Sequence, residues 1–178
     1  MSARRNLIIT PESHLAFERS LEMLDNSLRD IRQVAMQMIP ELLMNDGLDA
    51  ALKDYCAYVQ RPEGLQVVYE SFGLDGPEME RDKAMAVYTI VQELMKNTIQ
   101  HASAGKVTVL VTNREGKVTV TVEDDGKGFD PVVLKGARGL GWDAILEKTA
   151  QLGARVDTRS APGERTTVRL EVELRGKE

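Results

Sequence analysis

The chain has 178 residues, of which 42% are hydrophobic and 29% charged, with a formal net charge of -5 at pH 7. This composition is typical of a globular domain and disfavours a disordered chain, a membrane protein and a nucleic-acid binder with its usual basic face. Cys56 is the only cysteine, which excludes a disulfide framework and a cysteine-based zinc site. Because no apolar run approaches the roughly 18 residues that span a bilayer and no signal peptide is visible, we expect a cytoplasmic protein, or the soluble portion of a membrane-bound sensor.

The first forty residues predict a long coiled-coil-type helix. Apolar residues recur at alternating spacings of four and three, as in a helical seam: Phe17, Leu21, Leu24, Leu28, Ile31, Ala35 and Met38. Pro40 ends the pattern, since proline breaks a helix. We expect residues 1–40 to form one helix of a hairpin or bundle, through which the chain makes a homodimer. The alternative is a helix folded back on the domain formed by residues 41–178.

Residues 41–178 predict helices interspersed with strands. Residues 41–60 and 78–102 are expected to be helical, and residues 65–70 to form a strand between them. Valine then alternates with polar residues on both sides of a turn at residues 113–116, which predicts a hairpin. The valines are Val107, Val109, Val111, Val118, Val120 and Val122.

The C-terminal part predicts one more helix and a second hairpin. Residues 140–152 form the helix, which Gly153 ends, and residues 155–159 and 166–174 form the hairpin. Inward-facing positions in the last strand are Val168, Leu170, Val172 and Leu174. The predicted fold is α+β, a two-layer α/β sandwich with helices on one face of a mostly antiparallel mixed sheet.

Three short blocks within residues 92–141 carry the candidate site. In the first, Glu93, Asn97 and His101 are four residues apart and share one face of a helix. A carboxylate and an amide oxygen one turn apart can hold a hydrated Mg²⁺. Alone, this pattern is more typical of an ordinary polar helix face, and the neighbouring blocks are what favour a metal site.

The second block, at residues 124–129, is a glycine loop that leaves a strand. A buried carboxylate at Asp124 can accept a hydrogen bond from an exocyclic amine such as that of adenine. Gly126 and Gly128 would permit a close backbone approach to the base and positive φ angles. A calcium turn is the poorer alternative, because the acidic residues lack the spacing of an EF-hand loop.

The third block, at residues 136–141, opens the next helix. Backbone N–H groups at a helix N-terminus bind anions, and Lys135 and Arg138 add positive charge nearby. The expected occupant is a triphosphate, with residues 129–137 as a lid over it. A simple glycine N-cap is the alternative, and a P-loop is excluded because its Gly-x-x-x-x-Gly-Lys-Ser/Thr pattern is absent.

In this order the blocks resemble the N box and the two glycine boxes of the catalytic ATP-binding domain of sensor histidine kinases, within the wider superfamily of gyrase-type ATPases. Residues 163–168 resemble the family's closing Gly-x-Gly-Thr-Thr-Val strand, with Arg165 where glycine is usual. The resemblance covers residues 40–174 and, more loosely, the preceding helix, which is similar to the second helix of the dimerisation and phosphoacceptor hairpin. It implies a Bergerat-type ATP-binding fold in residues 41–178, with ATP and Mg²⁺ as cofactors, phosphoryl transfer to a histidine, and a response-regulator receiver domain as partner.

The resemblance also implies a role for each site residue. Asn97 would coordinate Mg²⁺, Glu93 would act as the base or hold the metal's water, and His101 would lie near the phosphates. The nucleotide-binding positions by resemblance are Lys96, Gln100, Asp124, Gly126, Gly128, Arg138, Gly139, Leu140, Gly141, Thr166 and Thr167. Gln100 stands where lysine is frequent in the subgroup, and Lys96 lies on a different helix face.

The phosphoacceptor histidine is expected outside this chain. The chain has two histidines, and His101 belongs to the N box, whereas His14 is not followed by the acidic residue typical of an acceptor. The chain would then be a fragment that begins after the acceptor, or a kinase that acts on another chain. The alternative function is a catalytically silent nucleotide-binding or regulatory module of the same fold, as in anti-sigma-type proteins or degenerate kinases.

Overall fold

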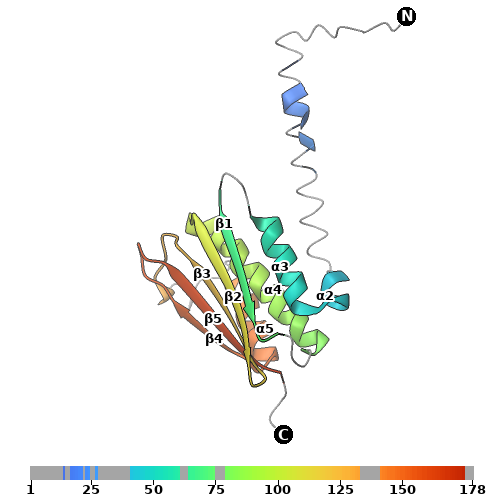
Figure 1. Cartoon of the computed structure of the whole chain (residues 1–178). Coiled ribbons are helices and arrows are strands. Elements are labelled where there is room, and N and C mark those ends of the chain that lie inside the picture. The colour runs from blue at the N-terminus through green and yellow to red at the C-terminus, as the bar shows by residue number, and fades with distance from the viewer. Residues whose placement is uncertain are drawn as a thin grey trace, which may run out of the picture. The chain divides into compact units, whose positions relative to one another are not determined.

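The computed structural model describes residues 14, 17–21, 23–24, 27, 41–60, 64–74, 79–132 and 141–174. The chain divides into two units, residues 1–40 and 41–178 (Figure 1). The described residues of the first unit are helical, and the Ser27 hydroxyl donates a hydrogen bond to the Met23 carbonyl one turn earlier (2.8 Å). The rest of the expected helix lies outside the described residues, so the coiled coil and the homodimer stay predictions.

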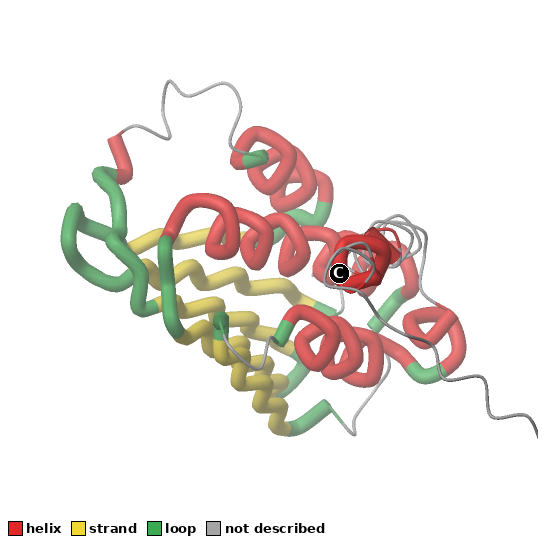
Figure 2. Tube along the Cα trace, turned by 90° about the horizontal axis from the view of Figure 1, so that it is seen from above, coloured by secondary structure: helices red, strands yellow, loops and turns green. Residues whose placement is uncertain are grey.

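The second unit contains a five-stranded sheet with helices on one face (Figure 2). The strand order is β1-β2-β3-β5-β4. The strands are β1 (Gln66–Phe72), β2 (Lys106–Arg114), β3 (Lys117–Asp124), β4 (Arg155–Arg159) and β5 (Thr166–Glu173). β1 runs parallel to β2 and the other neighbours are antiparallel, which confirms the predicted mixed, mostly antiparallel sheet.

Side-chain alternation along the strands separates the buried face of the sheet from the open one. The predicted valines of β2 and β3 are at most 3% exposed and face the helices, while their neighbours, many of them threonines, face outward. β-Branched residues suit this arrangement because they pack well on a pleated, half-buried surface. Both predicted hairpins are confirmed, β2 with β3 and β4 with β5.

The helices are α2 (Glu41–Asn45), α3 (Gly47–Val59), α4 (Arg81–Asn97) and α5 (Trp142–Gln151), and η1 (Thr98–Ala102) is a short π-helical segment. The helical structure predicted for residues 41–60 is confirmed, and it is divided into α2 and α3 at Gly47, which adopts a φ of +83°. The predicted helix 78–102 begins at Arg81 and changes to π-helical winding after Asn97. In the described part of the chain, no helix is long and apolar enough to cross a bilayer.

The core lies between α4 and the sheet. Val87, Ile90, Val91 and Met95 of α4 are fully buried, and Leu94 is 5% exposed, as expected for the face turned to the strands. Tyr55 of α3 packs edge-on against Tyr88 of α4, with ring centroids 5.9 Å apart, a favourable aromatic arrangement. The position of α4 matters for the site, because its C-terminal end carries the first block of polar residues.

Candidate functional site

A cavity of about 300 Å³ lies where α4 passes into η1, between the ends of β3 and β5 and the start of α5. Its walls are largely apolar: Leu94, Ala102, Val122, Phe129, Trp142 and Val168. Its polar lining residues are Asn97, Thr98, Gln100, His101, Asp124, Lys127 and Thr166. An apolar slot with a few polar groups is the usual form of a small-molecule site and suits a flat aromatic ring.

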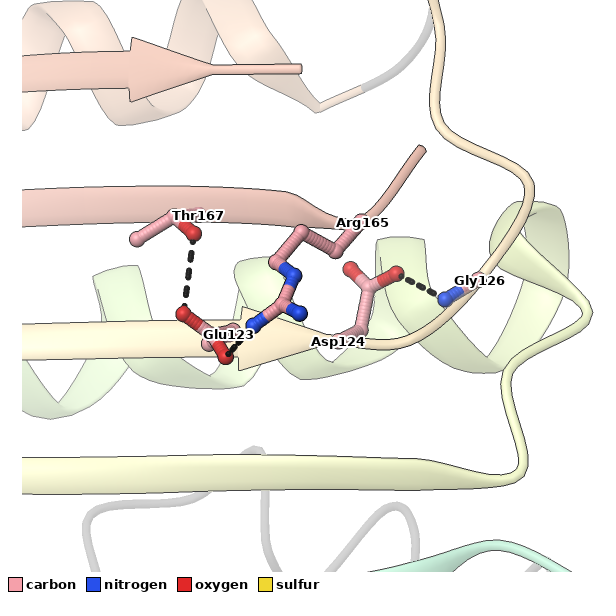
Figure 3. Close-up of polar contacts among 5 residues, drawn as sticks. All are labelled: Glu123, Asp124, Gly126, Arg165 and Thr167. Carbon is pink, nitrogen blue, oxygen red and sulfur yellow. Dashed lines mark hydrogen bonds and ion pairs between the residues drawn. The ribbon is translucent and has the colours of Figure 1, made fainter. Parts of the chain in front are cut away.

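Asp124 is the one buried ionisable residue among those that line this cavity, and its position defines the base of the cavity. It ends β3 and is only 5% exposed. Its Oδ1 accepts a hydrogen bond from the Gly126 amide (2.9 Å; Figure 3), and its Oδ2 accepts one from the Thr98 hydroxyl (3.3 Å). Burial raises the pKa of Asp124 above its ordinary value, although these two hydrogen bonds oppose the rise. A carboxylate that is buried in a cavity and has a raised pKa is typical of a binding site.

Gly126 and Gly128 are required by packing within the protein. A Cβ at Gly126 would lie 2.5 Å from the Ala102 carbonyl oxygen and 2.7 Å from the Asp124 carboxylate. Gly128 has a φ of +57°, and a Cβ there would collide with the carbonyl oxygens of Ala161 and Glu164. The positive φ predicted for both residues was therefore right for Gly128 and wrong for Gly126, whose φ is not in the left-handed region. Their role is to hold the loop against η1 and the β4–β5 turn.

The π-helical winding of η1 places its polar residues along the cavity. Asn97 lines the cavity together with Gln100 and His101, so the structure brings these three predicted residues together. π-Helical segments are frequent at functional sites, where the extra residue per turn redirects side chains. Thr98 is 5% exposed, and its Oγ1 also lies 3.3 Å from the Leu94 carbonyl oxygen, so its single hydrogen is shared between this oxygen and Asp124.

Glu93 and Lys96 lie outside the lining of the cavity. Lys96 Nζ is 3.5 Å from Glu93 Oε1, so the two side chains pair with each other on α4. The Glu93 carboxylate also approaches Gly141, where a Cβ would lie 2.5 Å from Oε2. Gly141 has a φ of +67° and immediately precedes α5. The structure therefore places Glu93 of the first block beside Gly141 of the third block and not among the residues that line the cavity.

Thr166 and Thr167 face opposite sides of the sheet. Thr166 is directly opposite Asp124 in the β3–β5 pair and lines the cavity. Thr167 donates to Glu123 Oε2 (3.1 Å) on the other face, where Arg165 also pairs with Glu123 (3.1 Å; Figure 3). Of the two threonines predicted to bind nucleotide, the alternation of the strand places only Thr166 on the cavity side of the sheet. The Arg165 side chain therefore also lies on the open face of the sheet, where it pairs with Glu123.

Part of the third block cannot be placed. Arg138, Gly139 and Leu140 lie outside the described residues, as do residues 133–137 of the expected lid. Their contacts with phosphate stay predictions.

Several cavity residues were missed from the sequence. Phe129, Lys127 and Trp142 line the cavity, and each adjoins one of the predicted glycines, so proximity to the glycine blocks was the available signal. Ser160 does not line the cavity but contacts two residues that do, and no signal in the sequence pointed to it. Its Oγ accepts a hydrogen bond from the Phe129 amide (2.9 Å) and lies 2.9 Å from Thr166 Oγ1.

The donor set limits the kind of metal site that this chain can form. Among the described residues no group of three or more His, Cys, Asp or Glu side chains could hold a metal ion. Asn97, whose side chain carries an amide oxygen, lines the cavity. This arrangement suits Mg²⁺, which keeps several waters and is commonly held by one or two protein oxygens together with substrate phosphates.

Comparison with known proteins agrees with this geometry. Residues 82–176, more than half of the chain, match the family described as histidine kinase-, DNA gyrase B-, and HSP90-like ATPases. The chain is 28% identical over 141 residues to the sensor histidine kinase MctS of Rhizobium johnstonii, covering 78% of this chain and 30% of that protein. It is also 28% identical over 153 residues to the histidine-protein kinase/phosphatase DegS of Brevibacillus brevis, covering 86% and 39%. The chain thus spans about a third of the length of these relatives.

Solved structures show the same fold. The histidine kinase domain of a blue-light-activated histidine kinase from Erythrobacter litoralis is similar with a TM-score of 0.62 and 23% identity, covering 71% of this chain and 65% of that one. Full-length ShkA, crystallised in complex with AMPPNP, is similar with a TM-score of 0.56 and 17% identity, covering 71% and 29%. Because the family match covers more than half of the chain, including β2 to β5 and the residues that line the cavity, the chain belongs to the histidine kinase-, DNA gyrase B- and HSP90-like ATPase family.

Proposed function

We propose that this chain is the ATP-binding kinase domain of a two-component sensor histidine kinase and that its cavity holds the adenine of Mg-ATP. The family match and the two kinase relatives support this function. The observation that carries it is the buried Asp124 carboxylate, which lies at the base of an apolar cavity and has acceptor capacity beyond the two hydrogen bonds it makes.

The cavity provides what adenine recognition requires. Phe129, Trp142 and Val168 supply apolar surface for the ring, and Asp124 supplies an acceptor for its exocyclic amine. A hydrogen bond to a charged group contributes roughly 1.5–3 kcal/mol, about twice a neutral one. The same carboxylate would repel the carbonyl oxygen that guanine carries in place of the amine.

The phosphates would extend toward η1 and the start of α5. Asn97 would contribute its amide oxygen to Mg²⁺, which neutralises phosphate charge when it is bound. His101 and Gln100 also line the cavity. Because Gln100 is neutral, it would attract a phosphate less strongly than the lysine that is frequent at this position. Arg138, Gly139 and Leu140 are proposed as further phosphate contacts. Glu93 is proposed as the base or as the holder of the metal's water.

The acceptor histidine would be supplied by another helix, in the full-length protein or in a partner chain. His14 lies in the first unit, is exposed, and is not followed by an acidic residue. We propose that the chain forms homodimers through residues 1–40, works in the cytoplasm, and serves a response-regulator receiver domain.

The nucleotide-binding step can be measured with the protein's own fluorescence. Trp142 is the only tryptophan and lines the cavity, so its emission should change saturably when ATP is added with Mg²⁺. Asp124→Asn should weaken binding. Asp125→Asn is the matched control, because Asp125 is exposed and an asparagine there can still accept the hydrogen bonds from Gly105 and Lys106.

The transfer step separates a kinase from a silent module of the same fold. The protein is incubated with γ-labelled ATP and a separately supplied helix that carries a histidine followed by an acidic residue. Label on that histidine supports the kinase. Saturable ATP binding without any transfer supports the regulatory module, and no ATP binding at all would exclude both.

A further inference from the structure

Two hydroxyl groups connect the glycine loop to the base of the cavity. The Phe129 amide donates to Ser160 Oγ (2.9 Å), and Ser160 Oγ lies 2.9 Å from Thr166 Oγ1. Thr166 is 7% exposed, lines the cavity, and is the cross-strand partner of Asp124. Ser160 comes directly after β4 and is not among the residues that line the cavity. The amide of Phe129 and the hydroxyls of Ser160 and Thr166 therefore form a chain that ends beside Asp124.

The direction of the hydrogen bonds in this chain follows from its first member. An amide N–H can only donate, so Ser160 Oγ accepts from Phe129. A hydroxyl that accepts a hydrogen bond becomes a stronger donor, because bonds in series polarise one another. This cooperativity favours donation from Ser160 to Thr166. The single hydrogen of the Thr166 hydroxyl is then free to point into the cavity.

We propose that Ser160 is a positioning residue that makes Thr166 a hydrogen-bond donor and thereby gives the cavity its preference for adenine. This inference rests on the proposed ATP-binding function and deepens it. Asp124 and Thr166 would together present an acceptor beside a donor. The edge of adenine presents the complement, an N6 amine that donates and an N1 that accepts, with contact to N1 either direct or through one water.

Guanine presents the opposite pattern on the same edge. Its O6 accepts where the carboxylate of Asp124 also accepts, and its N1–H donates where the Thr166 hydroxyl donates. A buried site whose polar groups are left unpaired discriminates strongly, by far more than a missing methylene does. If Ser160 were absent, the Thr166 hydroxyl could rotate, and it would then serve as donor or acceptor with less preference.

The experiment compares ATP with 1-deaza-ATP, in which a C–H group replaces N1. Binding is followed through Trp142 fluorescence in the wild-type protein and in Ser160→Ala. In the wild type, 1-deaza-ATP should bind about tenfold more weakly than ATP, the effect of about one hydrogen bond. In Ser160→Ala, ATP should bind more weakly and the difference between the two nucleotides should fall to less than about threefold. Ser160→Thr keeps the hydroxyl and should show the same roughly tenfold difference between ATP and 1-deaza-ATP as the wild type.

Two further variants keep the test decisive. Thr166→Val removes the final hydroxyl and should abolish the difference in the same way, even if Ser160→Ala does not fold. Thr167→Val makes the same change on the opposite face of the sheet and should leave the difference intact. Equal binding of the two nucleotides by the wild type, or an unchanged difference in Ser160→Ala, would overturn the proposal while leaving ATP binding established. A wild type that binds neither nucleotide would overturn the proposed function as well.

Discussion

Asp124→Asn should stabilise the protein without nucleotide and weaken its binding of ATP. The carboxylate is 5% exposed and makes two hydrogen bonds, with the Gly126 amide and the Thr98 hydroxyl. An asparagine can preserve both contacts. Its oxygen accepts from Gly126, and its amino group donates to Thr98, whose own hydrogen can go to the Leu94 carbonyl. The substitution therefore removes the charge and little else.

The sign of the stability effect follows from the raised pKa of Asp124. Burial makes the folded protein hold the Asp124 proton more tightly than the unfolded chain, whose pKa is near the ordinary 3.8. The ionised carboxylate therefore opposes folding, and stability falls as pH rises from 3.8 through the raised pKa. At pH 7 the asparagine variant should be more stable by about 0.5–2 kcal/mol. Its ATP affinity should fall about 10- to 150-fold, as expected when a hydrogen bond to a charged group is lost.

Urea denaturation without nucleotide, at pH 7 and at successively lower pH, measures the first effect, and a Trp142 fluorescence titration with ATP measures the second. The stability difference should shrink as pH falls through the raised pKa of Asp124. Asp125→Asn, an exposed neighbour, should change neither quantity much. The reasoning is refuted if Asp124→Asn destabilises the nucleotide-free protein, or if the variant binds ATP as well as the wild type.

Three other substitutions or labels test the packing around the site. Gly128→Ala should reduce the free energy of unfolding by more than the about 1–2 kcal/mol expected for a left-handed residue, because its Cβ meets two carbonyl oxygens. Gly153→Ala is the control, because Gly153 has nearly the same φ (+58°) as Gly128 (+57°) but nothing lies within 4 Å of a Cβ there. Equal losses of stability for the two variants in urea denaturation would contradict the packing argument. Gly141→Ala should also destabilise the protein, because its Cβ would meet the Glu93 carboxylate. In a double-mutant cycle, adding Glu93→Ala should recover part of that loss, whereas strictly additive effects would show that Glu93 does not obstruct the new Cβ. Cys56 is 2% exposed and burial raises its pKa to about 12, so a thiol reagent at pH 8 should label it only through unfolding. Saturating ATP should slow that labelling further, and rapid labelling of the folded protein would contradict the burial.

The strands could be predicted because their side chains alternate. The valines of β2 and β3 follow a period of two, and the structure buries each of them against the helices. The same period was enough to distinguish Thr166 from Thr167, although both were predicted to bind nucleotide, since Val168 and Leu170 were predicted to face inward. Extending this alternation from Val168 back to Thr166 places Thr166 on the buried face of the sheet and Thr167 on the open face.

The local winding at the site could not be predicted in this way. The local sequence around the π-helical segment after Asn97 is compatible with a continuous α-helix. The break before α3 did have a local signal, because Asn45-Asp46-Gly47 is a turn sequence and Gly47 adopts a φ of +83°. Gly126 illustrates the same limit. The sequence correctly indicated that a glycine is needed at this position, but the reason is that Ala102, from another segment of the chain, packs closely against it. Ser160 was missed because its importance lies entirely in contacts with Phe129 and Thr166.

The central claim is that the cavity between Asp124 and Trp142 holds the adenine ring of ATP. A crystal structure of the protein with a non-hydrolysable ATP analogue and Mg²⁺ tests it most directly. The ring should lie against Trp142 and Phe129, with its amino group within hydrogen-bonding distance of the Asp124 carboxylate. A nucleotide bound elsewhere, or a cavity filled by the protein's own side chains at saturating analogue, would contradict the claim.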